Sequence, residues 1–141
     1  MATISHRPMR YTDALTPLRD ADAAECWAMG ASPRVALIES LRGSLQAFAV
    51  LEDEVPLAFW GYSGGWVGDT VYGWLLTCPA IEGHKFRLAR SSRRVVEWLL
   101  RSYNRIVIVV HEDHLLSIKW LTWLGFHPIS PGPIIYMAKE K

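Results

Sequence analysis

Cysteine is scarce in this sequence: Cys26 and Cys78 are the two among 141 residues. Two cysteines cannot build a disulfide framework or a zinc ribbon, so neither is expected. A run of about 18 apolar residues is also missing, which argues against a membrane span. Met1–Arg10 lacks the apolar core of a secretory leader. We therefore expect a soluble protein made in a reducing compartment.

An excess of either charge is lacking as well. Fifteen basic residues stand against fourteen acidic ones, which gives a formal net charge of +1. A general nucleic-acid binder should carry a broad basic excess, so this balance makes nucleic acid an unlikely partner on composition. Half of the residues are hydrophobic, which excludes an intrinsically disordered chain. The length fits one domain spanning residues 1–141.

Tryptophan, in contrast, is abundant, with seven residues. Large apolar rings suit either a dense core or a contact surface. Both alternatives stay open from composition alone.

The first third of the chain predicts one strand followed by helices. A serine followed by a proline is a typical N-cap and first-turn pair, and glycine commonly ends a helix. The expected elements are a strand at Ala2–Arg7 closed by Pro8, a helical segment at Thr12–Met29 with a break at Pro17, and a helix that begins at Ser32-Pro33 and stops near Gly43.

The middle of the chain predicts three strands with connections too short for crossovers, so we expect an antiparallel meander. A long helix and a continuous apolar run (RIVIVV) follow; such a run is typical of a strand buried on both faces. The helix would act as a crossover that sets this strand parallel to the third strand of the meander. The expected strands are Leu45–Leu51, Val55–Tyr62 (followed by a Ser63-Gly64-Gly65 loop), Thr70–Thr77 and Arg105–Val110, with the helix at His84–Tyr103.

The chain is expected to end with a helix at His114–Leu124, stopped by Gly125, and a strand at Ile134–Lys139. The complete order is β-α-α-β-β-β-α-β-α-β. This order predicts an α/β (α+β) fold with a mixed central sheet and helices on both faces.

The element order, together with the segment Leu121–Phe126 (LTWLGF) after the buried strand, resembles the GNAT N-acetyltransferase superfamily. The resemblance covers nearly the whole chain in element order, and at the residue level it is strong in the last third. A closer likeness is to GNAT-like proteins of tailed bacteriophages, including internal virion proteins of short-tailed phages. The segments that carry it are Leu18–Asp22 with Glu25, Trp74–Thr77, the basic helix from Phe86-Arg87 through Arg93-Arg94, and Ile118–Leu121 before Leu124-Gly125-Phe126.

The resemblance implies a virion-associated protein, of the internal or ejected type, that acts by binding with degenerate catalytic motifs. Its partners would be other virion proteins or further copies of itself, its location the virion or the host cytoplasm, and no cofactor would be required. The alternative is an active enzyme that transfers acetyl groups from acetyl-CoA to a small amine or a host protein. A third, weaker hypothesis is a small nucleic-acid-binding accessory protein.

In the superfamily, a glycine-rich turn holds the CoA pyrophosphate through exposed backbone N–H groups and a helix N-terminus. The matching stretch here is Ala80–Phe86, which has one glycine and carries Glu82, an acid that would face phosphate unfavourably. It could equally be an ordinary strand-to-helix connection. If CoA binds, the expected residues are Thr77, Gly83, Lys85, Arg87 and Arg90.

The catalytic pieces that the superfamily often uses are weak or missing. The position of the tyrosine that protonates the leaving thiolate is Leu121, which cannot donate a proton. The asparagine often found seven residues earlier is His114, and the strand Thr70–Thr77, where a glutamate base is common, contains no acid. Asp69 lies just before this strand and Glu82 after it. No catalytic residue is assigned.

Two further groups look reactive but favour structural roles. His111–His114 has the composition of a metal site, yet no third histidine or cysteine is near it, and Asp113 is a plausible N-cap for the next helix. We therefore expect no metal. Cys78 follows an apolar strand, which favours a buried small hydrophobe over a nucleophile.

Two surfaces are candidates for interaction. Four arginines recur on the long helix at spacings that place them in one stripe. This stripe is either a solvated face, an anion site or a docking surface for a partner. The last helix is apolar almost all round, so its surplus apolar area is either core or covered by another chain. The predicted interface residues are Trp120, Trp123, Arg94 and Arg101, the other stripe arginines being Arg87 and Arg90.

Overall fold

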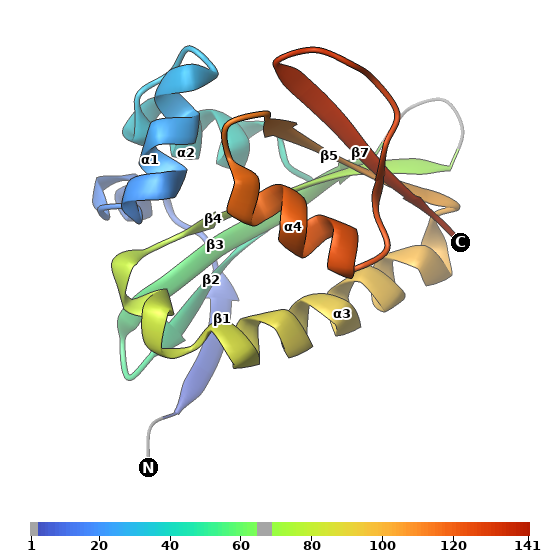
Figure 1. Cartoon of the computed structure of the whole chain (residues 1–141). Coiled ribbons are helices and arrows are strands. Elements are labelled where there is room, and N and C mark those ends of the chain that lie inside the picture. Colours follow the sequence, from blue (N-terminus) through green and yellow to red (C-terminus); the bar gives the residue numbers. More distant parts are fainter. Residues whose placement is uncertain (1–2, 65–68) are drawn as a thin grey trace. The chain divides into compact units, whose positions relative to one another are not determined.

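The computed structural model describes residues 3–64 and 69–141. In this part of the chain, seven strands form one mixed sheet with the order β1-β2-β3-β4-β5-β7-β6 (Figure 1). The elements are β1 (Ile4–Pro8), η1 (Tyr11–Leu15), α1 (Asp20–Ala28), α2 (Pro33–Gly43), β2 (Gln46–Glu52), β3 (Val55–Gly64), β4 (Thr70–Thr77), η2 (Pro79–Gly83), α3 (Lys85–Ser102), β5 (Arg105–His111), α4 (Leu115–Trp123), β6 (His127–Pro128) and β7 (Ile134–Glu140); η1 and η2 are short 3-10 helices.

The predicted order of strands and helices is confirmed. Strand β4 pairs with β5 in parallel, from Thr70 opposite Arg105 to Gly73 opposite Ile108, as the crossover through α3 predicts. Strands β2 and β3 pair antiparallel around the polar turn at residues 53 and 54. The α/β class with a mixed sheet is therefore established.

The predicted helix signals act as expected at α2 and near Pro17. The hydroxyl of Ser32 accepts a hydrogen bond from the Val35 N–H at 3.2 Å, and Pro33 occupies the first turn. Pro17 lies between η1 and α1, so the segment expected to be helical from Thr12 to Met29 is two elements. A proline in a helix interior removes a hydrogen bond and clashes with the preceding turn, which accounts for the break.

Several element ends differ from the sequence prediction. Pro8 lies inside β1 opposite Phe48, which an edge strand allows because its outer N–H groups need no partner. The loop expected at Ser63-Gly64 is the end of β3, whereas Gly65, like Ala2, lies outside the described residues. The two-residue β6 was not predicted; it pairs with β7.

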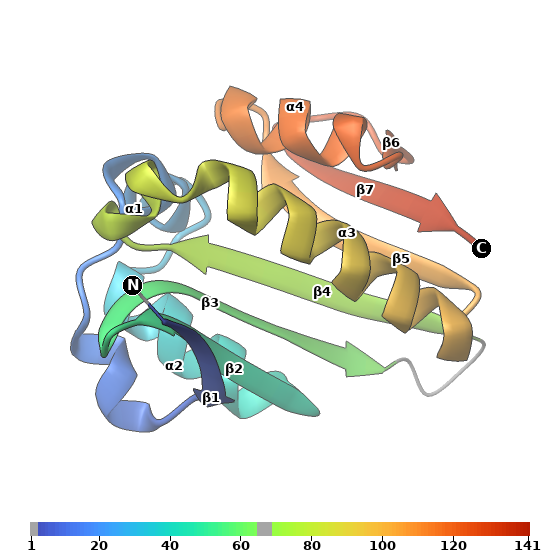
Figure 2. The same cartoon turned by 90° about the horizontal axis from the view of Figure 1, so that it is seen from below.

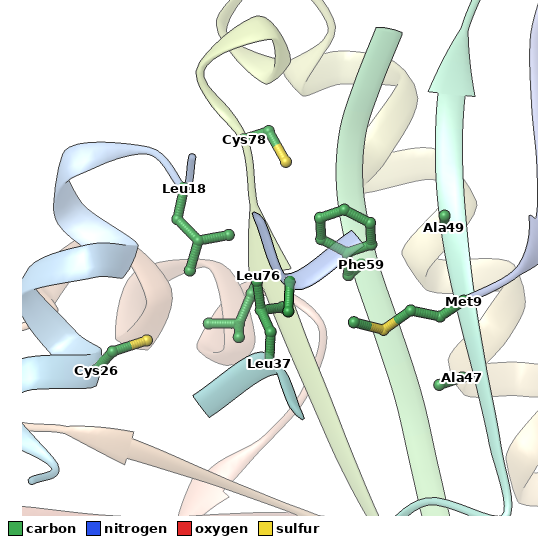
Figure 3. Close-up of a cluster of buried hydrophobic side chains, with 10 residues drawn as sticks. Met9, Leu18, Cys26, Leu37, Ala47, Ala49, Phe59, Leu76 and Cys78 are labelled. Carbon is green, nitrogen blue, oxygen red and sulfur yellow. The ribbon is translucent and has the colours of Figure 1, made fainter. Parts of the chain in front are cut away.

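The chain divides into two compact units: Met1–Ser63 with Trp74–His84, called unit 1, and Gly64–Gly73 with Lys85–Lys141, called unit 2. Unit 1 has a core in which Phe59 and Leu37 are completely buried (Figure 3). Residues that pack around them are Met9, Ala14, Leu18, Cys26, Ala47, Ala49, Leu76 and Cys78.

In unit 2, β5 and β7 pair antiparallel, from Arg105 opposite Glu140 to His111 opposite Ile134, and α4 lies beside β7 (Figure 2). The buried apolar residues of this unit include Ile106, Val107, Val110, Leu121, Leu124, Phe126, Met137 and Ala138. The expectation that β5 is buried on both faces is wrong at Val109, which keeps 37% of its surface exposed.

Candidate functional site

The end of β4 is tied to α1 inside unit 1. Thr77, the last residue of β4, is buried, and its backbone N–H donates to Asp22 Oδ2 at 2.8 Å. Its hydroxyl donates to the same carboxylate oxygen. Asp22 lies in the first turn of α1 and is 3% exposed. Both polar donors of Thr77 are thus used by the chain itself.

Arg19 completes this cluster. Its backbone N–H donates to the Thr77 carbonyl at 2.8 Å. Its guanidinium lies 3.7 Å from Asp22 Oδ2 and 3.5 Å from Glu82 Oε1. Glu82, expected to oppose a bound phosphate, therefore has a cation of its own chain beside it. Arg19 and Asp22 belong to the segment that carries the family likeness, but their contacts with Thr77 cannot be predicted from the sequence, because nothing in the spacing links α1 to β4.

The connection after β4 is a closed turn. The Ile81 N–H donates to the Cys78 carbonyl at 3.0 Å, and the His84 N–H donates to the Ile81 carbonyl at 2.8 Å. His84 Nε2 lies 2.9 Å from Glu52 Oε2. A Cβ added at Gly83 would meet no heavy atom of the chain within 4 Å, so packing within the chain does not require glycine there. Both interpretations of this stretch, a CoA cradle and an ordinary strand-to-helix connection, stay predictions.

The five residues expected at a CoA site fall in both units. Thr77 and Gly83 belong to unit 1, whereas Lys85, Arg87 and Arg90 belong to unit 2 and are exposed along the first turns of α3. The chain joins the two sets at the bond between residues 84 and 85. Their role toward a cofactor stays a prediction.

Two positions that the resemblance aligns with functional side chains of the superfamily, Leu121 and His114, are buried here. Leu121 is 2% exposed, so a buried aliphatic side chain stands where a proton donor is expected. His114 is buried and caps α4, since its Nδ1 accepts a hydrogen bond from the Ser117 N–H at 3.3 Å. The prediction that Asp113 is the N-cap is wrong, because His114 takes that position.

Both thiols are buried, as expected for Cys78. Burial, with smaller contributions from Asp22 and Asp13, raises the pKa of Cys78 to about 12. Burial, then the charges of Glu25 and Asp22, raises the pKa of Cys26 to about 11. Both remain neutral thiols at physiological pH, which makes them poor nucleophiles. No group of three or more His, Cys, Asp or Glu residues in the described ranges is placed to hold a metal ion.

A groove of about 390 Å³ lies in unit 2, where α3, the end of α4 and β7 meet. The Arg93 guanidinium carbon lies 4.3 Å from the centroid of the Trp123 ring, a cation–π contact. Lys139 Nζ donates to the Leu124 carbonyl at 2.8 Å. The groove is lined by Arg93, Val96, Glu97, Trp123, Leu124, Gly125 and Lys139.

The exposure of the predicted interface residues is uneven. Trp123 keeps 53% of its surface exposed, whereas Trp120 is half-buried. Of the two predicted interface tryptophans, Trp123 is therefore the more exposed. Arg94 and Arg101 are exposed on α3. The interface role of all four residues remains a prediction.

Comparison with family models and with curated proteins finds no match. Solved structures do match over nearly the whole chain. The GNAT domain of S. lividans PAT is similar with a TM-score of 0.73 at 14% identity, covering 96% of this chain and 89% of that one. The fold is that of the GNAT acetyltransferases.

Two further acetyltransferase structures are similar over nearly the whole chain. The ribosomal-protein-S5-alanine acetyltransferase from Vibrio fischeri has a TM-score of 0.63 at 16% identity, with coverages of 97% and 92%. The yncA protein from Salmonella typhimurium, solved with its cofactor acetyl-CoA, has a TM-score of 0.59 at 14% identity, with coverages of 98% and 94%. These similarities establish the GNAT fold. Because the identities are low, they do not establish a ligand or an activity.

No helix in the described part of the chain combines the length and apolarity that crossing a bilayer requires.

Proposed function

We propose that residues 1–141 form one GNAT-fold domain that acts by binding, as an internal or ejected component of a tailed-bacteriophage virion, and that does not transfer acetyl groups efficiently. The phage assignment rests on the sequence likeness at Leu18–Asp22, Trp74–Thr77 and Ile118–Leu121. The protein would work in the virion or the host cytoplasm, against other virion proteins or further copies of itself, with no cofactor required.

The tie between Asp22 and Thr77 carries the non-catalytic part of the proposal. A strand-end N–H that serves a cofactor must be open to it, and that of Thr77 is held by a carboxylate at 2.8 Å. A buried carboxylate beside the expected cofactor residue also disfavours the negatively charged phosphates of CoA. The fold alone does not determine activity, so the proposal that acetyl transfer is inefficient rests on these local groups.

Two further positions support the same conclusion. Glu82 adds a second acid in the turn where the superfamily offers backbone N–H groups to the pyrophosphate. Leu121 has no proton to give to a leaving thiolate and is enclosed by its own chain. Acetyl transfer here would need both a different anion site and a different acid.

Exposed apolar side chains on α4 support a binding role. Leu115 is 72% exposed and Leu116 is 49% exposed, on the same short helix as Trp123. Large apolar side chains gathered on one exposed element mark contact surfaces in soluble proteins. We place protein contacts at Leu115 and Leu116, next to the predicted interface residue Trp120.

The test is calorimetric titration of acetyl-CoA into the purified protein, together with mass spectrometry of purified particles of the phage that encodes it. We expect no heat at millimolar acetyl-CoA and the protein among the particle components. Micromolar binding would contradict the non-catalytic proposal. Absence of the protein from the particles would contradict the virion assignment and would leave the non-catalytic proposal unaffected.

The second candidate is an active acetyltransferase on a small amine or a host protein. It is favoured by the three exposed cations Lys85, Arg87 and Arg90 at the start of α3 and by the acetyl-CoA bound to yncA, which has the same fold. If it is correct, the triple change of these residues to alanine should weaken acetyl-CoA binding. Arg34→Ala with Arg42→Ala, a change of two basic residues on α2, should leave binding unchanged.

A further inference from the structure

The near-neutral net charge of the chain hides a strong segregation of charge. Unit 2 contains ten basic and five acidic residues, for a formal charge of +5. Unit 1 contains five basic and nine acidic residues, for a formal charge of −4. These two values make up the net charge of +1. The objection to a polyanionic partner that rests on net charge therefore does not hold for unit 2.

Most of the positive charge of unit 2 lies on α3, which carries six of the basic residues and one acid, Glu97. At about 100° per residue, Arg90, Arg94 and Arg101 lie within about 40° of each other around the helix. These three and Arg87 are exposed, and none of the four has an ion pair among the described residues. They form a cationic stripe about 21 Å long.

Aromatic rings flank this stripe. Trp98, 45% exposed, lies on one side of Arg94 around the helix. On the other side, Arg93 stacks on the ring of Trp123, which forms one wall of the groove. Arginines interleaved with exposed indoles offer charge for phosphates and flat surfaces for bases, the combination that binds single-stranded nucleic acid.

We propose that the second half of α3 and the Trp123 groove bind single-stranded nucleic acid. Arg94 and Arg101 contact phosphates. The Trp123 indole, whose ring orientation the contact with Arg93 fixes, stacks on a base. The site lies away from the start of α3, where a CoA pyrophosphate is expected. The inference rests on the binding role proposed above and is independent of the virion assignment and of acetyl-CoA.

Five of the six cations on α3 are arginines, whose planar fork binds phosphates and carboxylates alike, so charge alone does not decide the ligand. Two further observations favour nucleic acid over an acidic protein segment. The stripe is long enough for about six stacked nucleotides at 3.4 Å each. Exposed indoles add stacking, which bases satisfy and acidic side chains do not.

The experiment measures binding of a fluorescently labelled twenty-nucleotide oligothymidine by anisotropy at several salt concentrations. We expect affinity to fall as salt rises, because arginines release counterions from the phosphates. Trp123→Ala should weaken binding about 5- to 150-fold, the range for loss of one stacked base, with the salt dependence unchanged. Arg94→Ala with Arg101→Ala should weaken binding and lower the slope of log K against log salt by about 1.4.

Two variants serve as controls. Arg34→Ala with Arg42→Ala removes the same charge from α2 in unit 1 and should leave oligothymidine binding unchanged. Glu97→Gln removes the acid that lines the groove and should strengthen binding. Circular dichroism of each variant confirms that it is folded.

Inorganic polyphosphate separates stacking from charge alone. We expect unlabelled oligothymidine to displace the labelled oligothymidine better than polyphosphate does at equal phosphate concentration. This advantage should be lost in Trp123→Ala. No binding at 50 mM salt overturns the proposal. Equal competition by polyphosphate with no effect of Trp123→Ala also overturns it, and assigns the stripe to an acidic protein partner instead.

Discussion

Asp22 accepts two hydrogen bonds from Thr77, one from the backbone N–H and one from the hydroxyl. A single carboxylate at the start of α1 thus joins that helix to the end of β4. Because both residues are buried, water cannot replace either bond when one partner is removed. The stability of unit 1 should therefore depend strongly on this one side chain.

Asp22→Ala should lower the free energy of unfolding by about 2–3 kcal/mol, because it leaves the buried Thr77 N–H without an acceptor. Urea denaturation followed by circular dichroism measures the change. Asp20→Ala, which removes an exposed carboxylate from the same helix turn, is the matched control and should cost well under half as much. Equal losses for both variants would show that the tie to Thr77 contributes little.

Leu121→Ala should destabilise the protein by about 2–5 kcal/mol, the cost of emptying a buried leucine site. Leu116→Ala on the same helix removes an exposed side chain and should change stability by about 0.5 kcal/mol or less. Thermal or urea unfolding of the two variants measures both changes in stability. If the protein proves to be an enzyme, Leu121→Ala should leave its turnover nearly intact under folded conditions, and a loss of orders of magnitude would disprove the structural role.

Gly61 and Gly43 should respond in opposite ways to alanine. A Cβ at Gly61 would lie 2.7 Å from the Gln46 carbonyl oxygen and 2.8 Å from Trp74 Nε1. Gly61→Ala should therefore cost about 1–3 kcal/mol through overpacking. Gly43, the last residue of α2, has nothing within 4 Å, so Gly43→Ala should be neutral or stabilise by up to about 1 kcal/mol. Chemical denaturation of the pair tests this, and a destabilised Gly43→Ala would contradict it.

Acid should weaken the protein partly through Asp13. Burial alone would raise the pKa of Asp13, but hydrogen bonds from the Arg7 guanidinium and the Arg10 N–H, with the nearby positive charges, lower it below its usual value. A lowered folded-state pKa means that the stabilisation is complete above the unfolded pKa of about 3.9 and is lost as pH falls through the folded value.

The measurement is the free energy of unfolding of the native protein and of Asp13→Asn between pH 6 and pH 2. The native protein should be the more stable at pH 6, and its advantage should shrink below about pH 4. An advantage that is constant across this range would show that the Arg7–Asp13 pair does not titrate as the geometry implies.

The order of elements could be predicted because the local signals were strong. Ser32-Pro33 begins a helix by hydrogen bonding and backbone geometry that involve neighbouring residues only. The apolar run of β5 and the amphipathic α3 define a crossover, and with it the parallel pairing to β4. Each of these features depends on residues close together in the chain.

The polar cluster of the candidate site could not be predicted in this way. Asp22 and Thr77 are separated by 55 positions, and neither belongs to a spacing that chemistry recognises. The contact of Arg93 with Trp123 also joins two helices that β5 separates in the sequence. The segregation of charge between the two units could not be predicted from the net charge, because the net charge is a sum over the whole chain. The fold determines which charged residues belong to the same unit.

The burial of Cys26 and Cys78 has a practical consequence. Since both thiols stay protonated and enclosed, a maleimide dye should leave the native chain almost unlabelled. One added cysteine then becomes a unique attachment point with no need to remove the natural ones. Ser91→Cys, at an exposed position on α3, would carry a crosslinker or a fluorophore close to the cationic stripe. The molecule is thereby ready for single-site photochemical capture of whatever contacts that helix.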